Sequence, residues 1–356
     1  SGNYTDYKIS GTVPTTVLSP QITFTEITSA VLTGLIYRGT TELGDYNNDG
    51  FLDIIMTGIN GSDERVSFIY RNNGDDTFTD QSGGFIGVEG GNAIWADYNN
   101  DGYLDIFHTG ISNMSVFSKL LRNNGDGTFS ENTNLSLTPL EFSSGAFADY
   151  NNDGYLDFIY SGRFNYDFVS KIFKNNGDET FTEQIGISLP GVANGSFEWG
   201  DFNNDGFVDL IYSGSSSGNW VTKIYKNDGN GNFTELQNTG FAVVSSGSTE
   251  WGDYDNDGYL DVLICGVSSD YNSHAKIYRN NGDETFTYQT NVSLTGISNG
   301  TGSWGDYNND GYLDILLVGS TWSSQISKIY RNNGAGSFSE DMSISLPGVG
   351  QGSGKW

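Results

Sequence analysis

The 356-residue chain is poor in several residue types, and each scarcity excludes a class of structure. Its single cysteine, Cys265, rules out an intramolecular disulfide and a cysteine-based zinc site. Sixteen basic residues stand against 44 acidic ones, a net charge of −28, which excludes nucleic acid as a natural partner. No apolar run approaches the roughly 18 residues of a spanning helix, and the N-terminus lacks the apolar stretch of a signal peptide. We therefore expect a soluble, mature or excised segment without membrane insertion.

Signals for α-helices are also missing, because no window keeps an apolar period of 3.6 residues. Glycine is abundant, with 49 residues, and aromatic residues make up 14% of the chain. High glycine together with many aromatic and β-branched residues is typical of a folded, turn-rich β protein.

A nine-residue motif, Asp-Tyr-Asn-Asn-Asp-Gly-Tyr-Leu-Asp or a close variant, recurs every 52 or 53 residues. It begins at Asp45, Asp97, Asp149, Asp201, Asp253 and Asp306. A second block follows it, such as IYRNNGDETFTY from Ile277. Each unit is predicted to form four short antiparallel strands, with the motif between the first two and a tight Asn-Asn-Gly turn between the last two. Tandem units of this kind indicate the blades of a β-propeller.

The chain ends predict a seventh blade. Trp356 falls at the phase of Trp95, Trp199, Trp251 and Trp304, two residues before the aspartate, where the other units have Leu43 and Phe147. Near the N-terminus, NYTDYKISG resembles a second strand and ITFTE a fourth strand. We therefore predict an all-β fold, a seven-bladed β-propeller in one domain, residues 1–356. The expected blades are 38–89, 90–141, 142–193, 194–245, 246–298 and 299–347, with a closing blade of residues 1–37 plus 348–356.

The motif carries oxygen side chains at positions 1, 3, 5 and 9 and a glycine at position 6, a pattern suited to a hard cation such as Ca²⁺. Three carboxylates and one amide without nitrogen or sulfur donors disfavour zinc and copper. The backbone carbonyl of position 7 is the expected fifth ligand. The predicted metal ligands are Asp45, Asn47, Asp49, Phe51, Asp53, Asp97, Asn99, Asp101, Tyr103, Asp105, Asp149, Asn151, Asp153, Tyr155, Asp157, Asp201, Asn203, Asp205, Phe207, Asp209, Asp253, Asp255, Asp257, Tyr259, Asp261, Asp306, Asn308, Asp310, Tyr312 and Asp314.

An EF-hand starts in the same way but needs a glutamate at position 12 and flanking helices. Position 12 is occupied here by Met56, His108, Tyr160, Tyr212, Ile264 and Leu317. The EF-hand is therefore excluded in all six units. An Asx-rich turn without metal is the other interpretation of this motif. Because six sites are spread around a ring, the expected role of about six Ca²⁺ ions is structural.

The run DYNNDGYLDI from Asp97, followed by blocks such as IYRNNGDETF, resembles the FG-GAP or VCBS repeats of bacterial extracellular proteins. It is more distantly similar to the propeller of integrin α subunits and to calcium-containing fungal propeller lectins. The resemblance covers essentially the whole chain. It implies that the motif loop binds calcium and that the protein works outside the cell, secreted or at the cell surface. The cut loop of the seventh unit keeps only Asp6, so we expect it to be empty.

The segments between the second and third strands differ in every unit and are expected on the face opposite the aspartate loops. That face carries the off-phase aromatic residues Tyr166, Trp220, Tyr271 and Trp322. Exposed aromatic side chains beside Asn, Ser and Asp suit recognition of sugars or proteins, although variable loops can equally be unconstrained. These four residues are the candidate ligand-binding residues.

Eleven of the 16 basic residues fall in the third strands. They form either a basic binding groove or ion pairs with neighbouring carboxylates, and so acidic a chain favours the second interpretation. One large apolar residue per unit stands two positions before the first aspartate, from Leu43 to Trp356. These residues are expected to pack between blades rather than to form a ligand-binding ring.

No residue pattern indicates an enzyme. His108 and His274 are isolated, Cys265 lies in an apolar run, and nucleophile elbows and phosphate loops are absent. We expect a non-catalytic, calcium-stabilised recognition or adhesion module for protein or glycan ligands. The alternatives are a carbohydrate-binding lectin and a structural repeat module of a cell-surface or filament assembly.

Overall fold

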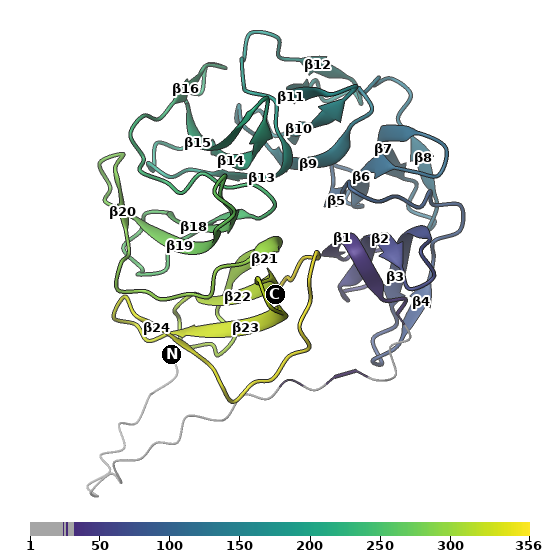
Figure 1. The fold of residues 1–356 in the computed structure, drawn as a ribbon. Coiled ribbons are helices and arrows are strands. Elements are labelled where there is room, and N and C mark those ends of the chain that lie inside the picture. The colour runs from purple at the N-terminus through teal and green to yellow at the C-terminus, as the bar shows by residue number, and fades with distance from the viewer. Residues whose placement is uncertain (1–23, 25, 28–31) are drawn as a thin grey trace, which may run out of the picture.

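The computed structural model describes residues 24, 26–27 and 32–356. In this part of the chain the strands form six separate four-stranded sheets, each made of four consecutive antiparallel strands. Figure 1 shows the sheets arranged as blades around a central axis, in chain order from purple to yellow. None of these residues belongs to a helix of the length and hydrophobicity that a membrane crossing requires.

Strands at the same place in each blade share their properties. The first strands are β1 (Leu35–Gly44), β5 (Ala93–Ala96), β9 (Glu141–Ala148), β13 (Ala193–Gly200), β17 (Thr249–Gly252) and β21 (Ser298–Gly305). The second strands are β2 (Asp53–Asn60), β6 (Asp105–Ile111), β10 (Asp157–Phe164), β14 (Asp209–Ser216), β18 (Asp261–Val267) and β22 (Asp314–Ser320). The third strands are β3 (Arg65–Asn72), β7 (Val116–Asn123), β11 (Asp167–Asn175), β15 (Asn219–Asn227), β19 (Ser273–Asn280) and β23 (Gln325–Asn332). The fourth strands are β4 (Phe78–Asp80), β8 (Phe129–Glu131), β12 (Phe181–Glu183), β16 (Phe233–Glu235), β20 (Phe286–Tyr288) and β24 (Phe338–Glu340).

The second strands form the centre of the core. In β6, β10, β14, β18 and β22 the first six residues are all buried. Both faces of these blades are covered, by neighbouring blades or, on one side of β22, by the C-terminal segment. The continuous apolar runs that the sequence shows at these positions are therefore required by two-sided burial. The fourth strands are only three residues long and form short edges, which limits edge-to-edge association.

Large aromatic residues pack between neighbouring blades. The sequence predicted this for the residues that stand two positions before each first aspartate, the set from Leu43 to Trp356. Trp251 in β17 stacks on Phe202 of the preceding blade, with ring centroids 5.9 Å apart and planes 3° apart. Trp95 stacks on Tyr46, Trp199 on Tyr150 and Trp304 on Tyr254 in the same way. A Cβ atom at Gly200 would lie 2.7 Å from the Trp251 ring, so this close approach requires glycine.

The prediction of a seven-bladed propeller is wrong, because the described residues form six four-stranded blades. Trp356 does pack at the predicted phase, stacked on Tyr307 at 5.8 Å. However, residues 350–356 form no strand, and the strand pairing of the described chain after β24 is limited to an isolated bridge between Val349 and Ile326. A recurring packing residue marks a contact between blades, whereas a strand needs a continuous hydrogen-bond ladder.

The C-terminal segment, residues 349–356, fills the space between the sixth and first blades. Gly354 N donates to Thr301 Oγ1 of β21 at 2.9 Å, and Gly39 N of β1 donates to the Gln351 carbonyl at 3.3 Å. The C-terminus accordingly lies beside β21 in Figure 1. The predicted closing blade also included residues 1–37, but Leu35–Tyr37 belong to β1 and pair with β2. Most of the remaining N-terminal residues, Asp6 included, lie outside the described residues.

Candidate functional site

Six loops, each carrying the nine-residue motif, join the first and second strands of the blades. The first aspartate of each loop folds it, as Asp253 does by accepting hydrogen bonds from Asp257 N (3.0 Å) and Gly258 N (2.9 Å). The same pair of bonds recurs in the other five loops at 2.7–3.1 Å. The glycine at position 6 has φ between 88° and 90° throughout, a conformation that other residues rarely adopt. The motif therefore builds the same turn in every blade.

The aspartate at position 9 begins the second strand and is completely buried in all six blades. One of its oxygens accepts a hydrogen bond of 2.7–2.8 Å from the backbone of the asparagine that ends the third strand. Burial, with a smaller contribution from neighbouring loop aspartates, raises the pKa of Asp157 to about 7 and the pKa of Asp261 to about 8. Each blade thus holds a buried carboxylate close to other carboxylates.

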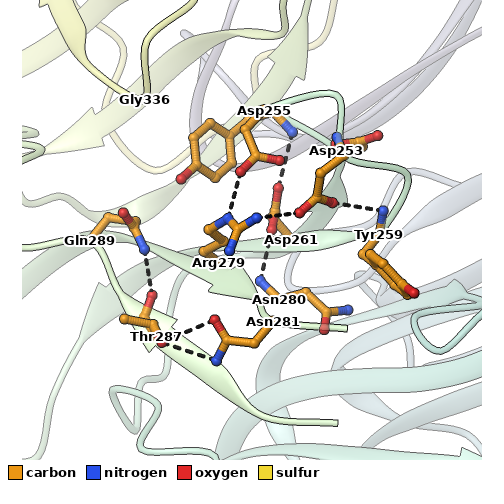
Figure 2. A network of polar contacts seen from close by, with 12 residues as sticks. Asp253, Asp255, Tyr259, Asp261, Arg279, Asn280, Asn281, Thr287, Gln289 and Gly336 are labelled. Carbon is orange, nitrogen blue, oxygen red and sulfur yellow. Dashed lines mark hydrogen bonds and ion pairs between the residues drawn. The ribbon is translucent and has the colours of Figure 1, made fainter. Parts of the chain in front are cut away.

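The fifth loop brings three carboxylates together. Ligand oxygens of Asp253, Asp255 and Asp261 all lie within 4.8 Å of one another. Arg279 of β19 donates to Asp255 at 2.6 Å, and its neighbour Asn280 donates to Asp261, as Figure 2 shows. Position 5, Asp257, does not join this group and pairs with Arg279 instead. In the other loops an asparagine replaces Asp255 at position 3.

Unsatisfied oxygens test whether the loops suit a cation. Four buried oxygens at positions 3 and 9 have no hydrogen-bond partner, namely Asn151 Oδ1, Asp209 Oδ2, Asp255 Oδ1 and Asn308 Oδ1. Leaving a buried polar atom unpaired costs about 1–3 kcal/mol. A hard cation coordinated by carboxylate and amide oxygens would satisfy these atoms and lower the pKa of the buried aspartates. The residues present therefore fit Ca²⁺.

The basic residues of the third strands pair with loop carboxylates. At position 5 of the loops, Asp49 pairs with Arg71, Asp101 with Arg122, Asp153 with Lys174, Asp205 with Lys226 and Asp310 with Arg331. Lys119, Lys171, Lys223 and Lys328 pair with glutamates of the adjacent fourth strands at 2.6–2.9 Å. This arrangement confirms the pairing interpretation, because a free basic groove would need these charges unpaired.

Two sets of asparagines connect the blades, a role that the sequence analysis missed. The asparagine at position 4 of a loop donates to the glycine carbonyl of the next loop, as Asn152 does to Gly206 O at 2.9 Å. Equivalent bonds start from Asn48, Asn100, Asn204 and Asn256. The asparagine that ends a third strand reaches back to the preceding blade, as Asn175 does to Tyr98 O at 2.7 Å. The sequence held a signal for the role of position 4, because this position is asparagine in all six motifs although it is not a predicted metal ligand.

The four candidate ligand-binding aromatics come from four successive blades. Tyr166, Trp322 and Tyr271 are 87%, 80% and 69% exposed, whereas Trp220 in β15 is half-buried. Arg163 lies over the Tyr166 ring at 5.9 Å. None of the four residues lines the cavity of about 620 Å³ that the first strands surround on the propeller axis. The structure therefore places separate aromatic contacts around one face.

The two histidines and the cysteine have packing environments. His108 is buried, stacks on Phe85 at 4.5 Å and lies 3.2 Å from Ser67 Oγ. Burial lowers the pKa of His108 to about 3, so its imidazole is neutral at physiological pH. His274 Nε2 lies 2.8 Å from Ser268 Oγ, and Cys265 is fully buried in β18.

A cavity of about 620 Å³ lies on the propeller axis, lined by the first strands and the C-terminal segment. The end nearest the aspartate loops carries Glu42, Glu198, Glu250, Lys355, Ile94 and Ala146. The middle is a ring of small polar side chains: Thr40, Asn92, Ser144, Ser196, Ser248, Thr301 and Ser353. The opposite end is formed by Arg38, Gly90, Phe142, Asn194, Ser246, Asn299 and Gln351, all with φ between 48° and 57°. Four of the five charged residues of the lining therefore lie at the end nearest the aspartate loops.

Comparisons with known proteins also find a repeat in this chain. A family model for the FG-GAP-like repeat matches residues 45–108, 111–160, 201–264 and 253–317, more than half of the chain. Cartilage acidic protein 1 of Homo sapiens is 27% identical over 177 residues, covering 46% of this chain and 26% of that protein. The Mus musculus protein is also 27% identical, covering 46% and 27%. The chain therefore spans about a quarter of the length of the curated relatives it matches.

A lectin of known structure shares the fold. It is an Agrocybe aegerita lectin described for specific recognition of non-reducing terminal N-acetylglucosamine. The TM-score is 0.55 at 21% identity, and the match covers 86% of this chain and 79% of that chain.

Proposed function

The chain belongs to the FG-GAP-like repeat family, and we propose that it is a calcium-stabilised, non-catalytic recognition module that binds a glycan outside the cell. The fold places six similar loops on one face and variable loops on the other. We assign calcium to the first face and the ligand to the second.

The carboxylate cluster of the fifth loop supports calcium most directly. Asp253, Asp255 and Asp261 present oxygens at mutual distances that one cation can span, and Asp255 retains an oxygen without a partner. Positions 1, 3 and 9 of the other loops would hold the ion in the same way, with position 5 and the carbonyl of position 7 as further donors. When bound, Ca²⁺ would neutralise the buried aspartates and so stabilise the turns.

The size of this effect follows from mass action. At a free calcium concentration tenfold above its dissociation constant, one site stabilises the folded state by about 1.4 kcal/mol. Six such sites would contribute roughly 8 kcal/mol, which is comparable to the total stability of an ordinary domain, about 5–15 kcal/mol. Structural calcium therefore accounts for how the chain tolerates six buried carboxylates.

Thermal melts with calcium and with EDTA test this part. We expect chelation to lower the melting temperature by more than ten degrees. Asp261→Asn should remove one calcium per chain in a calorimetric titration, because the amide keeps the acceptor for Asn280 N but loses the charge. Asp270→Asn, in an exposed loop between β18 and β19, is the matched control and should keep the full stoichiometry. An unchanged melt in EDTA would refute calcium stabilisation.

The glycan assignment is supported by exposed aromatic rings on variable loops. Aromatic rings provide rigid apolar area for the faces of sugar rings, while nearby hydroxyl and amide groups provide hydrogen bonds. Trp322 and Tyr166 are the most exposed of the candidate rings. The shared fold of a lectin that recognises N-acetylglucosamine makes this sugar the first to test.

A glycan array that includes terminal N-acetylglucosamine is the decisive experiment. We expect binding that Trp322→Ala or Tyr166→Ala weakens. Met114→Ala, which alters a 97% exposed side chain in the equivalent loop of the second blade, should bind as the unmodified chain does. Failure to bind any glycan, with capture of a protein ligand through the same aromatics, would replace the glycan by a protein. Binding that ignores all three substitutions would move the site elsewhere.

A further inference from the structure

The end of the axial cavity nearest the aspartate loops holds an excess of negative charge. Glu42 of β1, Glu198 of β13 and Glu250 of β17 each stand three residues before the first aspartate of a loop, and all three line the cavity. Lys355 of the C-terminal segment stands at the same phase. Three carboxylates thus share one ammonium group.

The lysine forms an ion pair with only one of these carboxylates. Lys355 Nζ lies 3.6 Å from Glu42 Oε1, and Glu198 Oε2 accepts a hydrogen bond of 2.5 Å from Trp251 N. Among residues 24, 26–27 and 32–356, the Glu250 carboxylate has no hydrogen-bond donor and no basic group within 4.0 Å. Its side chain is half-buried and lines the cavity. Arg38, the other cation of the lining, stands at the far end and pairs with Glu89.

An ionised carboxylate in this cavity raises the free energy of the folded state unless a positive charge pairs with it. Ionised carboxylates removed from water cost several kcal/mol unless they are paired. Burial raises the pKa of Glu250 to about 7 and also raises the pKa of Glu198 and Glu42, each opposed by Lys355. A ligand that brings positive charge into the cavity would relieve this cost.

The spacing of the carboxylates argues against a bare metal ion. In the described part of the chain, Asp253, Asp255 and Asp261 are the acidic triad whose ligand oxygens converge within 4.8 Å, and the three glutamates of the cavity do not form such a group. A cation that contacts all three glutamates must therefore be larger than a single metal ion. The cavity volume of about 620 Å³ is within the usual range for small-molecule sites, roughly 300–1,000 Å³.

The other lining residues indicate which uncharged groups such a cation would carry. Ile94 and Ala146 complete the same end of the cavity as the glutamates and give it an apolar side. The adjacent ring of serine and threonine hydroxyls accepts hydrogen bonds. An aliphatic chain against Ile94 and Ala146, with ammonium groups toward the glutamates, matches this division.

We propose that the axial cavity binds an aliphatic diamine in its doubly protonated form. Two positive charges match the charges that Glu198 and Glu250 carry once they release their protons, while Lys355 pairs with Glu42. This site is separate from the glycan-binding loops and the calcium loops, and it does not rest on the function proposed for them.

Isothermal titration of the full chain in saturating calcium tests the proposal, with 1,5-diaminopentane as the probe and 1,5-pentanediol as its uncharged counterpart. We expect saturable binding of one diamine per chain and no binding of the diol. Glu250→Gln and Glu198→Gln should each weaken the diamine at least tenfold, because each removes a facing charge. Glu340→Gln, which alters a glutamate of β24 on the outer edge paired with Lys328, is the control and should bind normally.

The variants at the cavity remove a costly charge, so we expect them to melt no lower than the unmodified chain. Absence of diamine binding by the unmodified chain would overturn the proposal. So would equal binding of the diol, or diamine binding that survives both glutamate substitutions, since diamine then associates with the acidic surface.

Discussion

Asn175 offers the sharpest test of how the blades are held together. Its side chain is 1% exposed at the end of β11. The amide nitrogen donates to Tyr98 O of the preceding blade at 2.7 Å and to Leu156 O at 3.0 Å, and the amide oxygen accepts from Gly177 N at 3.0 Å. Asn175→Ala removes all three bonds without altering an apolar contact of the core.

The expected loss follows from what each truncated bond leaves behind. The buried Tyr98 carbonyl becomes unsatisfied, which costs about 1–3 kcal/mol. The bonds to Leu156 and Gly177 are closer to solvent, so water can replace them and each should cost about 0.5 kcal/mol. Asn175→Ala should therefore lower the free energy of unfolding by roughly 3 kcal/mol.

The neighbouring residue provides a matched control. Asn176 is exposed and bonds only Thr180 and Thr182 of its own turn, at 2.9 and 3.1 Å. Asn176→Ala should cost about 0.5 kcal/mol, since water replaces these bonds. Asn175→Asp keeps the acceptor for Gly177 but places a carboxylate against two carbonyls, and should destabilise at least as much as alanine.

Urea denaturation followed by tryptophan fluorescence in saturating calcium measures these differences. A constant urea slope across the variants would show that the surface exposed on unfolding is unchanged. If Asn175→Ala lost no more stability than Asn176→Ala, the interpretation of the third-strand asparagines as links between blades would be refuted.

Three further predictions concern single positions. Gly177→Ala should lower stability by about 1–2 kcal/mol, because φ is 78° and the new Cβ would lie 2.6 Å from the Tyr155 ring, whereas Gly186→Ala has no atom within 4 Å of its new Cβ and should cost less in the same denaturation assay. Burial raises the pKa of Glu250 to about 7 in the folded state from an ordinary value of 4.5, so its contribution to stability is complete below pH 4.5 and is lost as pH rises through 7. The melting temperature of Glu250→Gln, relative to that of the unmodified chain, should therefore rise by roughly 4 °C between pH 5 and pH 8. An unchanged difference would contradict this assignment. Burial and the nearby Glu250 raise the pKa of the Cys265 thiol, so a thiol reagent such as DTNB should react only after unfolding, and rapid reaction of the folded chain would show that β18 opens.

The local architecture was predictable because its causes lie within one repeat. The positions of the four strands follow from apolar runs, from the Asn-Asn-Gly turn and from the aspartate motif. The pairing of third-strand bases with loop carboxylates, such as Arg71 with Asp49, also joins residues of the same unit. The packing of Trp251 against Phe202 was predictable from the recurrence of a large residue at one phase.

The candidate site was predictable only in part. Sequence reasoning grouped positions 1, 3, 5 and 9 of each loop. In the fifth loop the structure brings together positions 1, 3 and 9, whereas Asp257 at position 5 turns to Arg279. The direction in which a side chain turns depends on the charges that neighbouring strands place beside it, which spacing along the chain does not report.

By itself, the sequence determined the strand pattern, the turn chemistry and the oxygen-rich loops, because hydrogen bonding and burial within about 52 residues decide them. Only the tertiary structure decided how many blades form, how Asn175 reaches a carbonyl 77 residues earlier, and which side chains meet on the axis. The equal phase of Trp356 and Trp304 suggested another blade, yet residues 350–356 pack between β21 and β1 without forming a strand. A repeat records what each unit needs for its own folding, whereas closure of the ring depends on contacts among all of the units.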